Sequence, residues 1–161
     1  MREVIFDYED LGDGRARTAF HSVRRREYYE GEYQIVPTGQ ASVRIEKGLD
    51  AEASVIRLTS SSPLRFNRNW QHIRRDNLDI TVLWFVKQGS ITFTHALGRQ
   101  TVTSGHLAIS RTLQPFRMDC MVDDASGHVL LHVVVPTHLV MDHIPGDLRP
   151  GTCFSSASGD C

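Results

Sequence analysis

The chain has 161 residues, of which 40% are hydrophobic and 23% are charged; this composition excludes a disordered protein and fits one globular domain. The formal net charge is -1, so the chain as a whole lacks the basic excess of a dedicated nucleic-acid-binding domain. The sequence has no run of about 18 apolar residues, and its acidic start has no apolar segment. We therefore expect no membrane span, no secretory signal and a cytoplasmic location.

The first predicted unit, residues 1–30, is polar and charged. Residues 15–29 contain good helix formers and a weak apolar stripe at Ala16, Ala19, Phe20 and Val23, which predicts a short helix. Arg24, Arg25 and Arg26 lie on the same segment, and we interpret this basic run as a solvated face.

The second predicted unit, residues 31–136, is a series of short strands. Turn signals such as Gln88-Gly89-Ser90 and Ser104-Gly105 separate the strands, at intervals of roughly 8–12 residues that are typical of a β-sandwich or barrel. The predicted strands cover residues 33–36, 51–60, 64–75, 79–87, 91–95, 100–103, 106–110, 114–121 and 128–135.

The third predicted unit, residues 137–161, begins with a helical pattern over residues 137–144. Pro136 suits the start of a helix, and Pro145-Gly146 suits its end. Three apolar residues of this segment are our candidates for a dimerisation surface: Leu139, Val140 and Ile144. The remaining residues are rich in Gly and Ser, so we expect a linker toward a domain that this chain does not contain.

Eight histidines and three cysteines make a metal site the first chemistry to test. His95 has no second histidine nearby. His128 and His132 are four residues apart on one predicted strand, and therefore about 13 Å apart, which is too far for one ion. The cysteines form no Cys-x-x-Cys pair, and the sequence has neither a Gly-x-Ser-x-Gly elbow nor a phosphate loop. We therefore predict no catalytic residue, no metal ligand and no cofactor.

The interior of the predicted barrel is the remaining candidate site. Alternation places Ile91, Phe93 and His95 on one strand face, Val82, Trp84 and Val86 on another, and Phe116 with Met118 on a third. If these faces point inward, they either fill the core or enclose a mostly apolar cavity for one small ligand. Our candidate ligand-binding residues are Trp84, Phe93, His95, Arg117 and His132.

Residues 51–154 resemble the N-terminal sensor domain of AraC-type bacterial transcription regulators, in which a cupin-like barrel precedes a helix–turn–helix DNA-binding domain. The resemblance covers about two-thirds of the chain and consists of glycines at turns and the apolar patterns of the predicted strands between them. Its motifs are Arg74-Arg75-Asp76 before Asp79-Ile80-Thr81-Val82-Leu83-Trp84, then Gln88-Gly89-Ser90, the Gly98 turn, Ser104-Gly105-His106-Leu107-Ala108-Ile109-Ser110, Val133-Val134-Val135-Pro136 and Gly151-x-x-Phe154.

The resemblance implies a mainly β fold, a cupin-like jelly-roll barrel with short N-terminal and C-terminal helices. It further implies an effector-sensing or dimerisation domain that takes a small organic effector in the barrel, pairs as a homodimer and reaches DNA only through a missing C-terminal domain. Two alternatives stay open. One is a small cupin enzyme, either an isomerase or a dioxygenase, and the other is a pure dimerisation module with a filled core.

Overall fold

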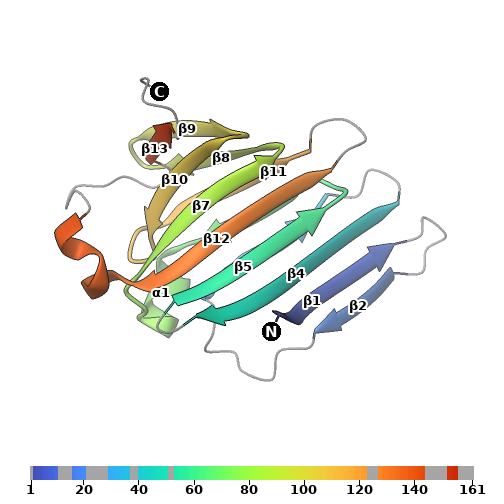
Figure 1. Cartoon of the computed structure of the whole chain (residues 1–161), viewed down its shortest axis with the longest axis horizontal. Coiled ribbons are helices and arrows are strands. Elements are labelled where there is room, and N and C mark those ends of the chain that lie inside the picture. The colour runs from blue at the N-terminus through green and yellow to red at the C-terminus, as the bar shows by residue number, and fades with distance from the viewer. Residues whose placement is uncertain are drawn as a thin grey trace.

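The computed structural model describes residues 2–10, 16–20, 29–36, 40–50, 53–122, 127–143 and 152–155. These residues form two antiparallel β-sheets that pack face to face (Figure 1). The larger sheet has eight strands, in the order β13 (Thr152–Ser155), β10 (His106–Arg111), β7 (Ile80–Gln88), β12 (His128–Pro136), β5 (Ala53–Ser60), β4 (Ala41–Asp50), β1 (Arg2–Asp10) and β2 (Ala16–Phe20).

The smaller sheet has five strands and covers the inner face of the larger one. Its order is β3 (Glu32–Ile35), β6 (Leu64–Arg68), β11 (Phe116–Met121), β8 (Ser90–His95) and β9 (Gly98–Thr103). Several neighbouring strands of the two sheets are distant in sequence, since β6 pairs with β11 and β12 lies between β5 and β7. The chain therefore has the predicted mainly β, jelly-roll-like fold, and every predicted strand region contains an observed strand.

Alternation of side chains along the strands builds the core. In β11, Phe116, Met118 and Cys120 are buried, whereas Arg117 and Met121 are exposed. In β12, Leu130 and His132 point inward with the same period of two residues. Because successive side chains of a strand lie on opposite faces, one buried row from each strand suffices to fill the space between the sheets.

The described helices are few and short. They are α1 (Trp70–Asp76) and the 3₁₀ turns η2 (Thr137–Leu139) and η3 (Met141–His143). The prediction of a strand over 64–75 is wrong after Arg68, because Asn69 begins a helix there. Its side chain accepts hydrogen bonds from the backbone N–H groups of Gln71 and His72, and the His72 ring accepts one from the N–H of Asn69.

The predicted N-terminal helix is wrong where the structure describes it, and the predicted C-terminal helix is present as two short 3₁₀ helices. Residues 16–20 form the edge strand β2, which pairs with the preceding strand β1 in a hairpin, so strand pairing overrides the weak apolar stripe. Val23 lies outside the described residues. After Pro136 the chain makes the two 3₁₀ turns η2 and η3 in place of one helix, and Ile144 lies outside the described residues.

The strand β13 was absent from our prediction, because we expected residues 152–155 to belong to a linker, whereas they pair with β10. Also absent were β1, β2 and β4. They add three neighbouring strands to one end of the larger sheet, and β1 pairs with β4 from Arg2 to Asp10 with a bulge between Val4 and Phe6. The polar N-terminal segment thus belongs to the sheet. Within the part of the chain that the structure describes, no helix has the length and apolar character needed to cross a membrane.

Candidate functional site

A continuous series of aromatic rings occupies the space between the sheets. Trp84 lies 4.8 Å from His132 and 5.7 Å from Phe93, measured between ring centroids. The series continues from Phe93 to Phe116 at 5.6 Å and from Phe116 to Phe66 at 5.8 Å. These contacts span the core from β12 in one sheet to β6 in the other. These five rings are thus packed against one another between the two sheets.

Three of the five predicted ligand-binding residues come together in this series. Trp84, Phe93 and His132 are all almost fully buried. The Trp84 Nε1–H donates a 2.8 Å hydrogen bond to the Ser110 hydroxyl, so the indole has a polar partner inside the core. His95 ends its strand, is only half-buried, and its Nδ1 accepts a hydrogen bond from the N–H of Leu97. It therefore lies at the end of the interior and away from the cluster.

Our placement of Arg117 in the interior is wrong. This side chain alternates with Phe116 and Met118 and therefore lies on the outer face of the smaller sheet. There it donates to the Asp119 carboxylate, which also accepts from Arg65 at 2.7 Å. Partial burial would raise the pKa of Asp119, but the hydrogen bonds from Arg65 and Arg117 outweigh it and hold this pKa below its ordinary value.

The two buried histidines of β12 give the interior its titratable groups. Both His128 and His132 point inward. Burial lowers the pKa of His132 from 6.5 to about 3, and the nearby His128 adds to this effect. The His132 imidazole is therefore neutral at physiological pH, and it presents a polar but uncharged edge beside Trp84. In the part of the chain that the structure describes, no three His, Cys, Asp or Glu side chains gather as a metal site.

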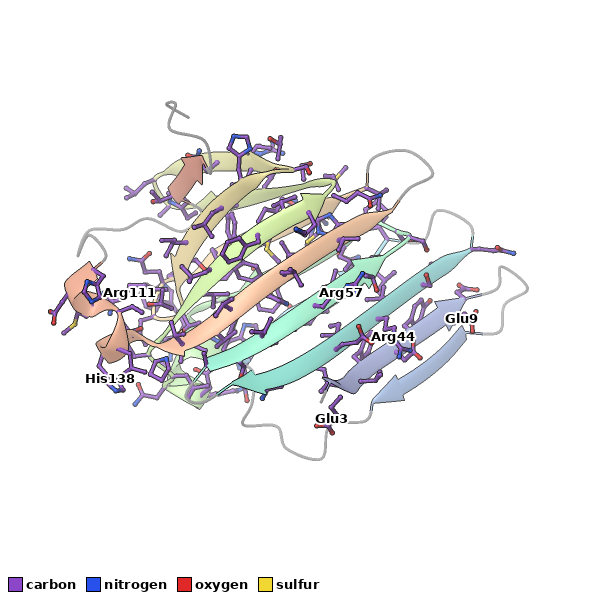
Figure 2. All side chains as sticks on the ribbon, in the orientation of Figure 1. Glu3, Glu9, Arg44, Arg57, Arg111 and His138 are labelled. Carbon is purple, nitrogen blue, oxygen red and sulfur yellow. The ribbon has the colours of Figure 1, made fainter. Side chains whose placement is uncertain are left out.

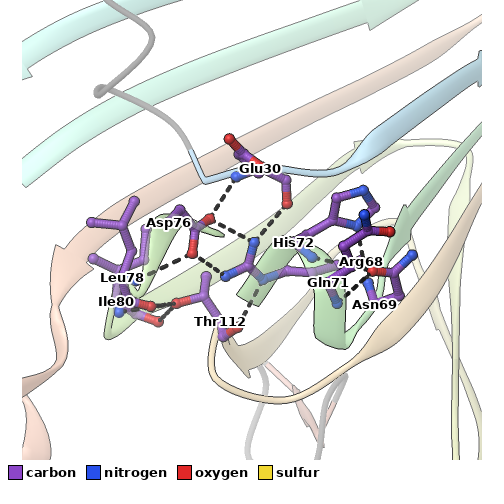
Figure 3. Close-up of polar contacts among 9 residues, drawn as sticks. All are labelled: Glu30, Arg68, Asn69, Gln71, His72, Asp76, Leu78, Ile80 and Thr112. Atoms are coloured by element: carbon purple, nitrogen blue, oxygen red, sulfur yellow. Dashed lines mark hydrogen bonds and ion pairs between the residues drawn. The ribbon is translucent and has the colours of Figure 1, made fainter. Parts of the chain in front are cut away.

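A second cluster of polar groups lies around the buried Arg68 (Figure 3). Its guanidinium makes a bidentate pair with Asp76, at 2.7 and 2.9 Å, and donates to the carbonyl oxygens of Glu30 and Thr112. Burial would raise the Asp76 pKa, but the hydrogen bonds from Arg68 and from the N–H groups of Glu30 and Leu78 hold it below its ordinary value. Every donor and acceptor here serves to connect α1, β6 and two loops, so we interpret the cluster as structural.

The outer face of the larger sheet carries a surface that our sequence analysis did not assign. Figure 2 views this face, with Arg57 and Arg44 lying on it and Arg111 at one end. Two adjacent rows of apolar side chains cross four of its strands: Leu107, Phe85 and Leu131 form the first row, and Leu83, Val133 and Val55 form the second. We call these six residues the outer patch.

A sequence signal for the outer patch was present. Residues 81–86 and 129–135 are the longest apolar runs of the chain, and they lie in the neighbouring strands β7 and β12. A strand with one face in water usually alternates apolar and polar residues, whereas a continuous apolar run is typical of a strand buried on both faces. In the single chain the outer face is only partly buried, because Leu83, Leu131 and Val133 are half-buried and Phe85 and Val55 are 37% and 38% exposed.

The sequence matches no protein-family model and no curated protein, but its structure resembles solved ones. The AraC-like transcriptional activator CuxR superimposes with a TM-score of 0.61 over 70% of this chain, at 9% sequence identity. The chain covers 41% of the length of CuxR. At this identity the likeness shows a shared fold.

Two cupin proteins resemble the chain more weakly. An RmlC-like cupin protein from Desulfovibrio desulfuricans gives a TM-score of 0.42 at 10% identity, over 76% of this chain and 96% of that one. The Schizosaccharomyces pombe Cnp3 cupin domain gives 0.40 at 9% identity, over 90% of this chain and 96% of that one. The two packed antiparallel sheets give the chain a jelly-roll-like fold.

Proposed function

We propose that the chain is the effector-sensing and dimerisation domain of an AraC-type transcription regulator that binds DNA through a separate domain. The observation that carries this proposal is the fold shared with CuxR, of which this chain covers 41%. The net charge of -1 is in keeping with it, because DNA binding would then reside outside this chain. In this proposal the chain has no catalytic step.

Sensing would use the ring series as the responsive element. A small, mostly apolar effector would enter beside Trp84 and Phe93 and hydrogen-bond to the neutral His132 imidazole. Because these rings already touch one another, the effector has to displace side chains to enter. The effector therefore binds a second arrangement of the core more tightly than the one described. This difference in affinity shifts the equilibrium between the two conformations of the regulator.

Thermal melts of the chain with a library of metabolites test the sensing role. At a concentration 100 times its Kd, an effector adds about 2.7 kcal/mol to the free energy of unfolding and raises the melting temperature by several degrees. The variant His132→Phe should lose this rise, whereas Thr94→Val, an exposed change on the other sheet, should keep it. A library without any hit, together with an unchanged filled core, would contradict sensing through the barrel.

A pure dimerisation module is the second candidate, and the close packing of the rings between the sheets favours it. Our predicted surface for pairing then includes Leu139, which is 43% exposed in η2, and the half-buried Val140 that follows it. If this segment carries the interface, Leu139→Asp gives monomers in gel filtration. If this variant is still a dimer, Leu139 and Val140 are not part of the interface, and the dimer forms through another face.

A further inference from the structure

The outer patch has the composition of an interface between protein surfaces. Its six side chains belong to four neighbouring strands and lie in two registered rows. The outer face of the smaller sheet is different, because Arg65, Asp119 and Arg117 form ion pairs there. Among the residues that the structure describes, only the outer face of the larger sheet therefore presents contiguous apolar side chains, and such patches mark places where another molecule binds.

The dimensions of the outer patch suit the centre of a dimer interface. Each row crosses three strands about 4.8 Å apart, and the rows are about 7 Å apart, so the six positions occupy roughly 200 Å² of sheet in each copy. Two copies would contribute about 400 Å² of apolar contact, and a stable interface buries about 1,200–2,000 Å² in total. The polar border of the same face, which includes Arg57 and Lys87, has to supply the remainder, as the polar rim does in known interfaces.

The charges on β7 favour a second copy of this chain as the partner. Lys87 is exposed near one end of the strand, and Asp79, whose side chain is 47% exposed, precedes the other end. About 26 Å separates the two positions along the strand. A two-fold axis that crosses β7 at right angles in the plane of the sheet reverses the strand of the partner. With the axis at the level of Leu83, each Lys87 faces the Asp79 of the other copy, and the row of Leu83, Val133 and Val55 meets the same row of the partner.

We infer that the outer patch is a homodimer interface, in which two copies of this chain pack their larger sheets face to face about such an axis. This inference rests on the dimerisation role proposed above and names its surface. The interface lies on β5, β7, β10 and β12, and the segment with Leu139 and Val140 stays outside its centre. The continuous apolar sequences of β7 and β12 then have a simple cause, since both of their faces are buried in the dimer.

Sedimentation and light scattering of the 161-residue chain, measured across a concentration series, test this inference. The unaltered chain should be a dimer at micromolar concentration. Phe85→Asp places a charge in the apolar centre and should weaken dimerisation at least 100-fold, while the monomer still folds because Phe85 is already 37% exposed. Val55→Asp, at a position 38% exposed, provides a second variant at the other side of the patch.

Two matched controls separate this face from other surfaces. Met121→Asp changes a residue 48% exposed on the smaller sheet, and Leu139→Asp changes one 43% exposed in η2; both should leave the dimer intact. A monomeric unaltered chain would overturn the inference. A dimer that survives Phe85→Asp and Val55→Asp, or one that Leu139→Asp dissociates, would overturn it as well. The thermal melts with metabolites are independent of all these results, so a failure of this surface and a failure of sensing can be distinguished.

Charge reversal tests the two-fold arrangement. Lys87→Asp brings like charges together and should weaken the dimer about tenfold or more, and the double variant Lys87→Asp with Asp79→Lys should restore it. Arg111 also pairs with Asp79, at 3.2 Å, so the single variant Asp79→Lys serves as a reference for that lost contact. A double variant as weak as the single ones would contradict the proposed axis.

Discussion

At the residue scale, Gly89 is a position that only glycine fits. It forms the turn between β7 and β8 with a φ of +80°, and an added Cβ would lie 2.5 Å from the Met121 carbonyl oxygen and 2.6 Å from the His128 Nδ1. Gly105 has a similar φ of +85°, but an added Cβ there meets nothing within 4 Å. The pair therefore separates the cost of the backbone conformation from the cost of a steric clash.

We predict that Gly89→Ala lowers the free energy of unfolding by about 2–4 kcal/mol, because both the backbone strain and the overlap with two neighbours contribute. Gly105→Ala should cost only about 1 kcal/mol, which is the conformational part. Urea unfolding followed by tryptophan fluorescence measures both values. Equal losses in the two variants would contradict the close approach of His128 to the turn.

The buried His132 predicts a loss of stability in mild acid. Its pKa is about 3 in the folded chain against 6.5 ordinarily, so below pH 6.5 the unfolded chain takes up a proton that the folded chain excludes. Stability is therefore complete above pH 6.5 and declines as the pH falls toward 3, by about 1 kcal/mol for each pH unit. Urea unfolding at pH 7 and pH 5 measures the loss, which should be about 2 kcal/mol.

Two variants show whether His132 is responsible. His132→Phe keeps a ring beside Trp84 and should remove most of the difference between pH 7 and pH 5. His138→Phe changes an exposed histidine in η2 and should leave the difference as it was. The interval lies above the range in which Asp76 and Asp119 take up protons, because the pKa of each is below its ordinary value. A difference that persists in His132→Phe would assign it to His128 or to another group.

At the element scale, the Arg68 cluster holds α1 against β6 and two loops. We predict that Arg68→Met destabilises the chain by about 3–5 kcal/mol, because it leaves the largely buried Asp76 without its cation. The double variant Arg68→Met with Asp76→Asn should recover part of this loss. Arg117→Met removes a surface pair with Asp119 and should cost less than about 1 kcal/mol. Similar losses at Arg68 and Arg117 would contradict the structural role of the cluster.

The elements that the sequence predicts correctly are those in which local pattern and long-range pairing agree. The strands over 79–87, 91–95 and 128–135 alternate or run apolar between clear turns, and the structure has β7, β8 and β12 there. The N-terminal helix fails because its apolar stripe is equally compatible with a strand, and pairing with β1 decides. The helix α1 was missed because the capping residue Asn69 lies inside a run that alternates on both sides.

The same reasoning explains the outcome at the candidate site. Alternation is a local property, so Trp84, Phe93 and His132 could be predicted to share the interior, as they do. The error at Arg117 contradicts that very rule, since a residue between two inward ones points outward. The outer patch could not be predicted as exposed, because a continuous apolar run does not reveal whether its second face meets the same chain or another molecule.

At the scale of the whole molecule, dimerisation through the outer patch couples stability to concentration. If folding and pairing are linked, a tenfold rise in protein concentration should raise the melting temperature by about 2 °C. The effect should vanish in Phe85→Asp, whose monomer gains nothing from a partner, and should persist in Met121→Asp. Differential scanning calorimetry over two decades of concentration measures it. A melting temperature independent of concentration in the unaltered chain would contradict the coupling.

The Arg68 cluster also has a consequence for the rates of folding and unfolding. Its guanidinium donates to carbonyl oxygens 38 and 44 residues away along the chain, so these bonds close only after the segments that carry them have been brought together. Interactions that form only after the transition state slow unfolding and do not increase the folding rate. Truncating the Arg68 side chain should therefore leave the refolding rate nearly unchanged and raise the unfolding rate. Arg68 thus determines how long the native state persists.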